Sequence, residues 1–374
     1  MNRGLWLSSA AALLVAASAC TGSEMPGRVA SETPRTAVAA DSSLADRAVH
    51  TATSLNDEVT LVAGGCAVDG CVSATRSAVL VSADGDRPVD AMGVARDGHT
   101  ATLLEDGRVL VVGGFTAEGQ PPLSSAEVYA PDTDRWIRVG STSTGRGGHA
   151  AARLGDGRVL VSGGWLESGR YTATTEIFDP VSERFTPGPR LPRGLDGLAA
   201  ASLTDGSVLV AGGQPSPGLA TDLAVLIAPD GSSSRRVGAL SSARFKHALV
   251  SLPSGEVLVI GGTSDDTELL ASTEVFDPRT RSFSPGPTMS SGRYKLSGGA
   301  SLLPDGRVLV AGGGPGVEVI DVQAGTSEPL ASAPPVRSSF STVSVVADTV
   351  RVVGGYDEGI ALTGTNLRIP LPSL

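Results

Sequence analysis

The stretch HTATLLEDGRVLVVGG, residues 99–114, contains the pattern that decides the fold of this 374-residue chain. His99 to Leu104 alternates small and apolar residues, which is typical of a half-buried strand. Asp106-Gly107 indicates a tight hairpin in which both central residues take positive φ. The run from Val109 to Val112 is apolar on both faces and predicts a strand enclosed between neighbouring sheets. Gly113-Gly114 then lets the backbone turn in a crowded place without a Cβ.

The double glycine recurs seven times, and each pair closes a short apolar run. The intervals between successive pairs are 49, 50, 49, 49, 51 and 42 residues. A period near 50 residues, with several short strands in each unit, predicts the blades of a β-propeller. The first glycines of the pairs are Gly64, Gly113, Gly163, Gly212, Gly261, Gly312 and Gly354.

Two further strands follow the double glycine in the best-preserved repeats. Glu127-Val128-Tyr129 predicts a third strand, and Trp136-Ile137-Arg138 predicts a fourth. The aromatic residues lie seven positions apart, as they do again in Phe178 with Phe185 and in Phe276 with Phe283. A double glycine followed by such an aromatic pair is the signature of kelch repeats, so the chain resembles the kelch-repeat superfamily from His50 to Leu374.

The predicted fold is therefore all-β: a seven-bladed β-propeller of four-stranded kelch-type blades over residues 46–374. Blades 1, 4 and 6 depart from the aromatic pattern, which weakens their packing locally without changing the number of blades. The last repeat has room for strands at Ile360–Thr363 and Leu367–Leu371. The sequence leaves open whether a segment such as Arg35–Ala40 adds a strand to the last blade.

Residues 1–20 predict export. The basic start Met1-Asn2-Arg3 and the apolar stretch from Leu5 to Ala17 form a secretory signal that is too short for a membrane span. Small residues before Cys20 resemble a bacterial lipobox, which implies cleavage there and lipidation of Cys20. Plain cleavage near Ala19 is the alternative. Acyl chains would hold the protein in the cell envelope, on the outer membrane of a Gram-negative cell, and residues 21–45 would form a flexible tether.

The net charge is −10 and no basic tract exists, which argues against nucleic acid and against charge-driven binding to lipid. The only expected contact with the membrane is the lipid anchor. Cys66 and Cys71 lie close together in an exported chain and predict a disulfide. A zinc site needs more ligands than two thiols, so no metal or cofactor is expected.

Arginine and histidine recur in step with the blades. The four histidines lie 14 residues before a double glycine, and five arginines lie 17 residues before one. In a structural interpretation they satisfy carbonyls or carboxylates at the blade junctions. In a functional interpretation they form a cationic collar around the central opening, as ring arginines do in some kelch modules that bind acidic peptides. We favour the structural interpretation for the histidines and keep the arginines as candidate binding residues: Arg47, Arg96, Arg146, Arg244 and Arg337.

The direction of the chain places the loop after each double glycine on the same face as this collar. These loops carry Phe115, Trp165 and Tyr356, and aromatic residues beside cations suit a sugar or an acidic peptide. The alternative is that they only cover the blade tops. Two matching segments of neighbouring blades, Arg244-Phe245-Lys246 and Arg293-Tyr294-Lys295, contain both lysines of the chain. We expect these segments to form an anion-binding patch.

The predicted function is a non-catalytic binding module for a protein, peptide or glycan. No nucleophile elbow, phosphate loop or HExxH motif is present, so no catalytic residue is assigned. The alternative is a sugar-processing enzyme, because kelch-type propellers include copper radical oxidases and a sialic acid mutarotase. The copper chemistry needs a free cysteine beside histidines and tyrosines, which this sequence does not offer. A mutarotase needs only a general acid and base. A structural spacer is a third interpretation.

Overall fold

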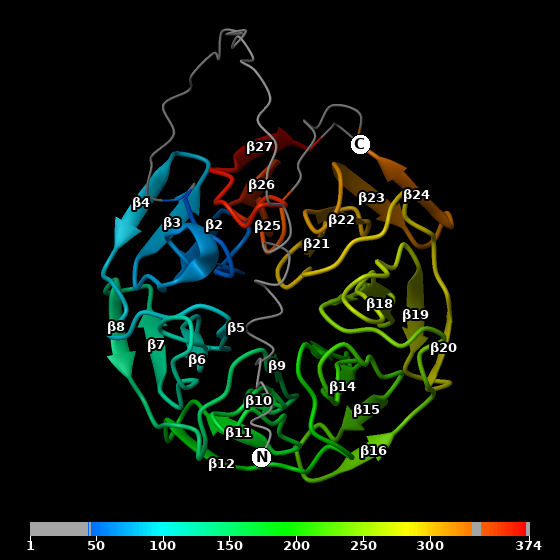
Figure 1. The fold of residues 1–374 in the computed structure, drawn as a ribbon, viewed down its shortest axis with the longest axis horizontal. Helices are drawn as coiled ribbons and strands as arrows, with labels where there is room; N and C mark the ends of the chain where they lie inside the picture. Colours follow the sequence, from blue (N-terminus) through cyan, green and yellow to red (C-terminus); the bar gives the residue numbers. More distant parts are fainter. Residues whose placement is uncertain (1–43, 45, 331–337, 372–374) are drawn as a thin grey trace, which may run out of the picture.

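The computed structural model describes residues 44, 46–330 and 338–371, which form a ring of seven antiparallel sheets around a central opening (Figure 1). Within each sheet the strands follow the order of the chain. This confirms the seven-bladed β-propeller. Outside the described residues lie the predicted signal peptide with Cys20, the predicted tether except Leu44, and Arg337.

The first and second strands of each blade form its inner half. The first strands are β1 (Thr51–Ser54), β5 (Thr100–Leu103), β9 (Ala150–Arg153), β13 (Ala199–Ser202), β17 (Ala248–Ser251), β21 (Ala300–Leu302) and β25 (Thr342–Val346). The second strands are β2 (Val59–Ala63), β6 (Val109–Val112), β10 (Val159–Ser162), β14 (Val208–Ala211), β18 (Val257–Ile260), β22 (Val308–Ala311) and β26 (Thr349–Val353).

The third and fourth strands form the outer half. The third strands are β3 (Ala78–Ser82), β7 (Ala126–Ala130), β11 (Thr175–Asp179), β15 (Ala224–Ile227), β19 (Thr273–Asp277), β23 (Val317–Asp321) and β27 (Asn366–Pro370). The fourth strands are β4 (Asp86–Val89), β8 (Arg135–Arg138), β12 (Arg184–Pro187), β16 (Ser234–Arg236), β20 (Ser282–Pro285) and β24 (Thr326–Pro329).

Blade 7 has three strands among the described residues, where four were predicted. Its third strand is β27, which lies where the sequence analysis expected the last strand of the repeat, Leu367–Leu371. Residues 360–363 do not form a strand but a loop, in which Leu362 makes a single bridge to Tyr356. The reason is local: the second strand pairs with residues 366–370, and the intervening residues are needed to connect the two.

The predicted backbone conformation is found at the double glycines but only in part at the hairpins. Both Gly113 and Gly114 have positive φ, and a Cβ on either would overlap a backbone carbonyl oxygen. In the hairpin, however, only Gly107 has positive φ, and Asp106 does not. The prediction that both residues adopt positive φ was therefore wrong. Hydrogen bonds between Leu104 and Arg108 and from Gly107 N–H to Leu104 O make a longer loop that needs glycine at one position alone.

The core lies between consecutive blades. The second strands β6, β10 and β18 are buried along their whole length because a neighbouring blade covers each face. Tyr129 and Trp136 pair across β7 and β8 with ring centroids 5.2 Å apart, as the spacing of the aromatics predicted. Each interface of this kind removes apolar surface from water, and this burial contributes about 25 cal/mol of stabilising free energy per Å². The fold is thus stabilised by a closed series of similar interfaces.

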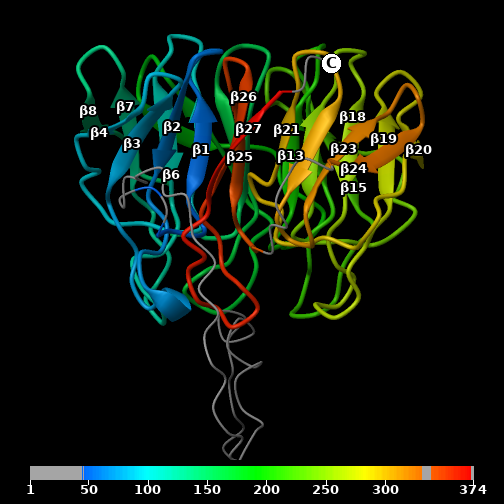
Figure 2. The same cartoon turned by 90° about the horizontal axis from the view of Figure 1, so that it is seen from above.

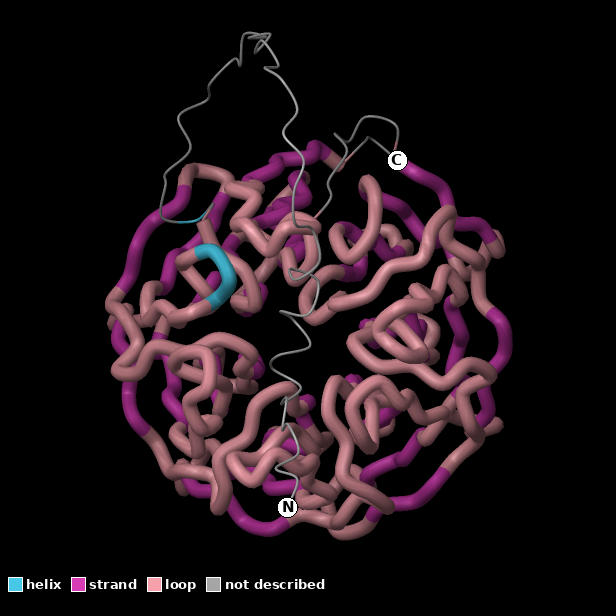
Figure 3. The backbone as a smooth tube through the Cα atoms, in the orientation of Figure 1, coloured by secondary structure: helices cyan, strands magenta, loops and turns pink. Residues whose placement is uncertain are grey.

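The two faces of the ring differ. The tight hairpins lie on one face, and the loops that follow the double glycines lie on the other, together with the 3-10 helix η3 (Asp69–Cys71) (Figure 2). Strands account for the outer parts of the blades, and loops dominate the view onto the opening (Figure 3). Within the described residues no helix has the length and apolar character that crossing a membrane would require.

Candidate functional site

The repeated arginines lie inside the blades. Arg96 donates from Nη1 to the Gly113 carbonyl at 2.8 Å and from Nη2 to Glu127 Oε1 at 2.7 Å. The same carboxylate accepts the Val94 N–H at 3.2 Å. Equivalent ion pairs recur in three other blades, which means that each buried charge has a partner. They join Arg146 to Glu176, Arg244 to Glu274 and Arg293 to Glu318.

This geometry overturns the predicted cationic collar. The repeated arginines among the described residues are no more than 2% exposed, and each guanidinium group donates to the carbonyl of the first glycine of a double glycine. They therefore cannot contact a ligand in this fold. Arg337 lies outside the described residues. The five buried arginines are Arg47, Arg96, Arg146, Arg244 and Arg293.

The histidines join neighbouring blades. His99 Nε2 lies 3.1 Å from the Thr51 hydroxyl of the preceding blade, and His149 Nε2 lies 2.9 Å from Thr100. His50 makes the same contact to Thr342 at 2.8 Å and so closes the ring. Burial lowers the pKa of His99 and of His149 to about 3, so both imidazoles are neutral. The buried place of the histidines agrees with the structural interpretation, but the predicted partners do not: three histidines contact a threonine hydroxyl instead of a carbonyl or carboxylate. His247 has no hydrogen-bond partner at either ring nitrogen among the described residues.

A ring of backbone hydrogen bonds surrounds the opening on the loop face. Each blade contributes one residue with positive φ to this ring. This residue lies two positions after the repeated arginine, or after the residue that replaces the arginine. Seven N–H to O=C bonds of 2.8–3.4 Å link these positions from blade to blade, with Leu296 as the donor in blade 6. The seven positions hold Val49, Gly98, Gly148, Gly197, Lys246, Lys295 and Phe340.

Four of these seven positions are not glycine, although glycine suits the conformation. A left-handed backbone costs an ordinary residue roughly 1–2 kcal/mol. Val49, Lys246, Lys295 and Phe340 keep this conformation at φ values of 54–58°. All four also line the central channel, a cavity of about 380 Å³ inside the ring. Strain that persists at such a position is typical of functional sites.

A second cavity, of about 220 Å³, lies on the loop face of the ring. We call it the channel mouth; its lining includes Val49, Phe115, Trp165, Lys246, Phe340 and Tyr356. The rings of Phe115 and Trp165 lie 5.5 Å apart, and each pairs through its backbone with the start of a blade. These backbone bridges confirm that the loops and the strand starts share one face. A role of the three aromatic residues in binding stays a prediction.

Two carboxyl groups in the channel mouth escaped the sequence analysis. Burial raises the pKa of Asp97 to about 7 and that of Asp196 to about 6. Asp196 also accepts a hydrogen bond of 2.9 Å from Gln214 Nε2. Each lies directly before a ring glycine, Gly98 or Gly197. The sequence did contain a signal for them: the position directly before the ring residue holds aspartate in these two blades and small or aromatic residues in the others.

The two lysines lie at consecutive ring positions, as their matching segments predicted. Lys246 Nζ is 2.6 Å from Asp266 Oδ1 and 5.0 Å from the centre of the Phe245 ring. Lys295 Nζ lies 4.7 Å from the ring centre of Tyr294 and 5.6 Å from that of Phe340. Burial lowers the pKa of Lys295. Because Asp266 neutralises Lys246, the patch is mixed in charge, and anion binding stays a prediction.

Cys66 and Cys71 are joined by a disulfide at the rim of the channel mouth. The loop between them ties blade 1 to blade 7 through Gly70 N–H to Ile360 O at 3.1 Å. Among the described residues, the group with three candidate metal ligands is this pair with Asp97. Sulfurs in a disulfide offer no thiolate, so the group does not fit a metal in this state.

Three segments match the family model described as Kelch motif: residues 106–143, 146–192 and 244–290, which belong to blades 2, 3 and 5. A solved structure described as "Structure of YjhT" is similar to 78% of this chain and 95% of that chain, with a TM-score of 0.57 and 14% identity, which shows the fold alone. No curated protein has a matching sequence. With its repeated motifs and seven blades, the chain is a kelch-repeat β-propeller.

Proposed function

We propose that this chain is a binding protein that holds a glycan at its channel mouth. The observation that carries the proposal is the departure from the repeat there. Glycine occupies the ring position in blades 2, 3 and 4, whereas Lys246, Lys295 and Phe340 occupy it in blades 5, 6 and 7. A propeller that only needed to close its ring would be better served by glycine throughout.

The chemistry of the mouth favours a glycan over the other predicted ligands, a protein or an acidic peptide. Asp97, Asp196 and Asp266 line it with Lys246, so carboxyl groups outnumber ammonium groups. Carboxylates accept hydrogen bonds from sugar hydroxyls, and the faces of Phe115 and Trp165 provide apolar surface for a sugar ring. An acidic peptide would meet repulsion at the same place.

The test is a glycan array probed with the purified protein. We expect selective binding that Trp165→Ala reduces at least tenfold, because this substitution removes an aromatic face from the mouth. The control is Val181→Ala, at a residue that is 93% exposed in a turn on the hairpin face. Equal loss in both variants, or binding that Trp165→Ala leaves unchanged, would contradict a site at the mouth.

A second candidate function is a sugar-processing enzyme at the same site. The observation that favours it is the pair of carboxyl groups whose pKa values, about 7 and about 6, allow one to donate a proton while the other accepts one. Proton NMR of anomeric exchange would decide between binding and turnover. Exchange that is accelerated by the wild type and abolished by Asp97→Asn or Asp196→Asn would establish the enzyme.

We further propose that the protein is exported and held in the cell envelope by a lipid on Cys20. The support is the signal-like sequence of residues 1–20 and the lipobox-like residues that end it. Fractionation should recover the wild type in the membrane and Cys20→Ser in the soluble fraction. Recovery of both in the soluble fraction would show plain cleavage instead.

A further inference from the structure

The channel mouth contains a buried carboxyl group without a partner. Asp97 is 8% exposed and lines this cavity, yet no described residue donates a hydrogen bond to its carboxyl oxygens. The sulfurs of the Cys66–Cys71 disulfide lie within 4.8 Å of a carboxyl oxygen and carry no proton to donate. Because the desolvation of a carboxyl group is costly, such a group is ordinarily paired. A ligand can supply the partner that Asp97 lacks.

A second buried polar group of the mouth is in the same condition. Tyr356 is 2% exposed and lines the cavity, and its hydroxyl has no hydrogen-bond partner among the described residues. Burial raises the pKa of this phenol, so the hydroxyl keeps its proton and can donate a hydrogen bond. Both groups are therefore free to bind a polar ligand.

The charges of the mouth favour a cation. Four carboxyl groups line it, whereas Lys246 is the one ammonium group among the described residues of its lining, and Lys246 is paired with Asp266 at 2.6 Å. Lys295 lines the channel but not the mouth, and its ammonium group lies over the rings of Tyr294 and Phe340. The carboxyl groups that no cation neutralises are those of Asp97, Glu118 and Asp196.

The aromatic rings of the mouth favour the same charge. Its lining includes Phe115, Trp165, Phe340 and Tyr356. The face of an aromatic ring attracts cations, most strongly in tryptophan. One of these rings already has such a contact, because Lys295 Nζ lies 5.6 Å from the centre of the Phe340 ring. Aromatic faces beside carboxyl groups suit an ammonium group and repel an anion.

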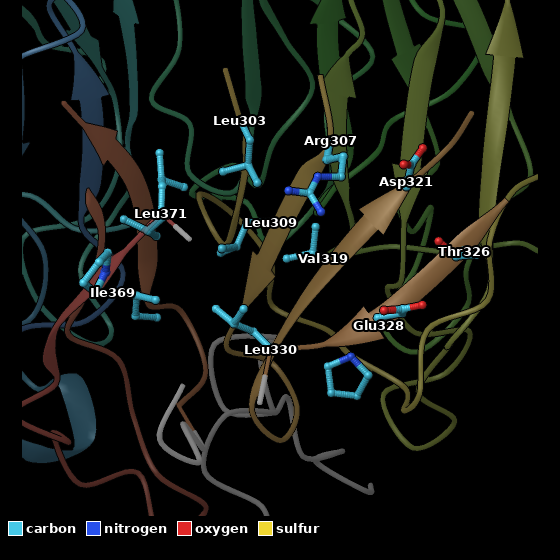
Figure 4. A pocket seen from close by; sticks show the side chains of 13 residues that line it. Leu303, Arg307, Leu309, Val319, Asp321, Thr326, Glu328, Leu330, Ile369 and Leu371 are labelled. Atoms are coloured by element: carbon cyan, nitrogen blue, oxygen red, sulfur yellow. The ribbon is translucent and has the colours of Figure 1, made fainter. Parts of the chain in front are cut away.

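A third cavity shows that acidic residues alone do not distinguish the mouth. It lies between blades 6 and 7, has a volume of about 170 Å³, and its lining includes Asp321 and Glu328 (Figure 4). None of the described residues that line it is aromatic, and Arg307 places a guanidinium group in the same cavity. The Asp321 carboxylate already accepts the Ala324 N–H at 2.9 Å. The mouth differs in having an unpaired buried carboxyl group beside aromatic rings.

Building on the proposed function, on which this step rests, we propose that the glycan at the channel mouth carries a free amine and is therefore an amino sugar. Asp97 is the partner of its ammonium group, and the hydroxyl of Tyr356 is free to donate to a sugar oxygen. Burial raises the pKa of Asp97 in the empty mouth. A bound ammonium group lowers that pKa again, because a nearby opposite charge favours the carboxylate.

The deciding experiment compares two oligosaccharides that differ only at nitrogen. The full chain is titrated calorimetrically with the glucosamine tetramer and with the N-acetylglucosamine tetramer, at a mildly acidic pH at which the amines are charged. We expect the glucosamine tetramer to bind about tenfold more tightly or better, with a preference that shrinks as salt is added. Equal affinities, tighter binding of the acetylated tetramer, or binding of neither would overturn the amino sugar. Binding to other sugars on the glycan array would then leave the proposed function standing.

Matched variants test whether the mouth is responsible. Asp97→Asn keeps the shape of the side chain but removes its charge, and it should abolish the preference for the glucosamine tetramer. Asp132→Asn removes the same charge from an exposed turn on the hairpin face and should leave the preference unchanged. Equal loss in both variants would show that the net charge of −10 attracts a polycation without a site. Tetralysine binding as tightly as the glucosamine tetramer would overturn the amino sugar and the glycan function together.

Discussion

The blade junctions and the channel mouth use charged residues in opposite ways. At the junctions Arg96, Arg146 and Arg244 repeat with the period of the blades, are fully buried and each bind a glutamate. At the mouth Asp97 and Asp196 follow no such rule and line an open cavity. In this propeller the repeated charged residues stabilise the architecture, whereas the residues that depart from the repeat line the proposed site.

Blade 4 supports this interpretation with a natural substitution. It has Leu195 where blades 2, 3, 5 and 6 have arginine and Val225 where those blades have glutamate, and both are buried in one apolar cluster. The ion pair has therefore been exchanged as a unit for a hydrophobic pair. Such exchanges are often neutral or stabilising, while the removal of one partner alone is costly.

The largest expected effect comes from breaking a junction pair. Arg244→Leu leaves Glu274 buried without its cation and should destabilise the fold by about 3–5 kcal/mol. Arg244→Leu with Glu274→Val, which copies blade 4, should recover most of this loss. Chemical unfolding of the two variants and the wild type measures both changes. A double variant as unstable as the single one would show that the arginine acts mainly through its other hydrogen bonds.

The next effect is a change in pH dependence at the mouth. Because burial raises the pKa of Asp97 from 3.8 to about 7, the folded protein keeps a proton that the unfolded chain loses between these values. The contribution of Asp97 to stability is therefore present at low pH and is lost as the pH rises from about 4 to about 7. Relative to Asp97→Asn, the free energy of unfolding of the wild type should fall by on the order of 2–4 kcal/mol as the pH rises from about 4 to about 7.

Urea unfolding of both proteins at several pH values between 4 and 8 measures this difference. The neutral buried histidines give a slope of the opposite sign, because their pKa values are lowered, but they are common to both proteins and cancel. A difference that does not change with pH would show that the Asp97 carboxyl titrates as an exposed group does.

A smaller effect is expected where a histidine lacks its partner. His247 faces Ala199, at the position where other blades supply threonine, and neither ring nitrogen has a hydrogen-bond partner among the described residues. Ala199→Thr should therefore stabilise the fold by about 1 kcal/mol, and Thr100→Ala should destabilise it by a similar amount. Thermal unfolding compares them. Destabilisation by both substitutions would show that the contact between blades does not depend on this bond.

The smallest expected effect on stability is at the ring itself. Lys246→Gly removes the strain of a left-handed backbone, which costs a non-glycine residue roughly 1–2 kcal/mol. The same substitution removes a partly exposed ion pair and increases the conformational entropy of the unfolded chain, and both effects destabilise the fold. The free energy of unfolding should stay within about 1 kcal/mol of the wild type. A much larger loss would assign Lys246 to the architecture and remove it from the proposed site.

The sequence predicted those features whose cause is local. The strands of blade 2, the double glycines and the aromatic pair of Tyr129 and Trp136 all follow from patterns within 40 residues. The sequence left two interpretations of the repeated arginines open, a structural one and a cationic collar, because periodicity does not tell which way a side chain points. A clue was present, since Glu127 and Glu176 recur at nearly constant distance after Arg96 and Arg146.

The mouth could not be derived from the sequence because the closure of the ring creates it. Asp97 and Asp196 belong to different blades, and Lys246 joins them from a third. Their raised pKa values arise from burial among loops whose packing no local pattern describes. Sequence alone could place Phe115, Trp165 and Tyr356 on the right face, but it could not show that they line one cavity.

The most direct test of the division between architecture and site is the glycan array run on two variants side by side. Arg244→Leu with Glu274→Val changes a repeated pair, and Lys246→Gly changes a ring residue two positions away. We expect the first variant to keep the binding pattern of the wild type and the second to lose it. Loss of binding in the junction variant, with full binding in Lys246→Gly, would contradict it.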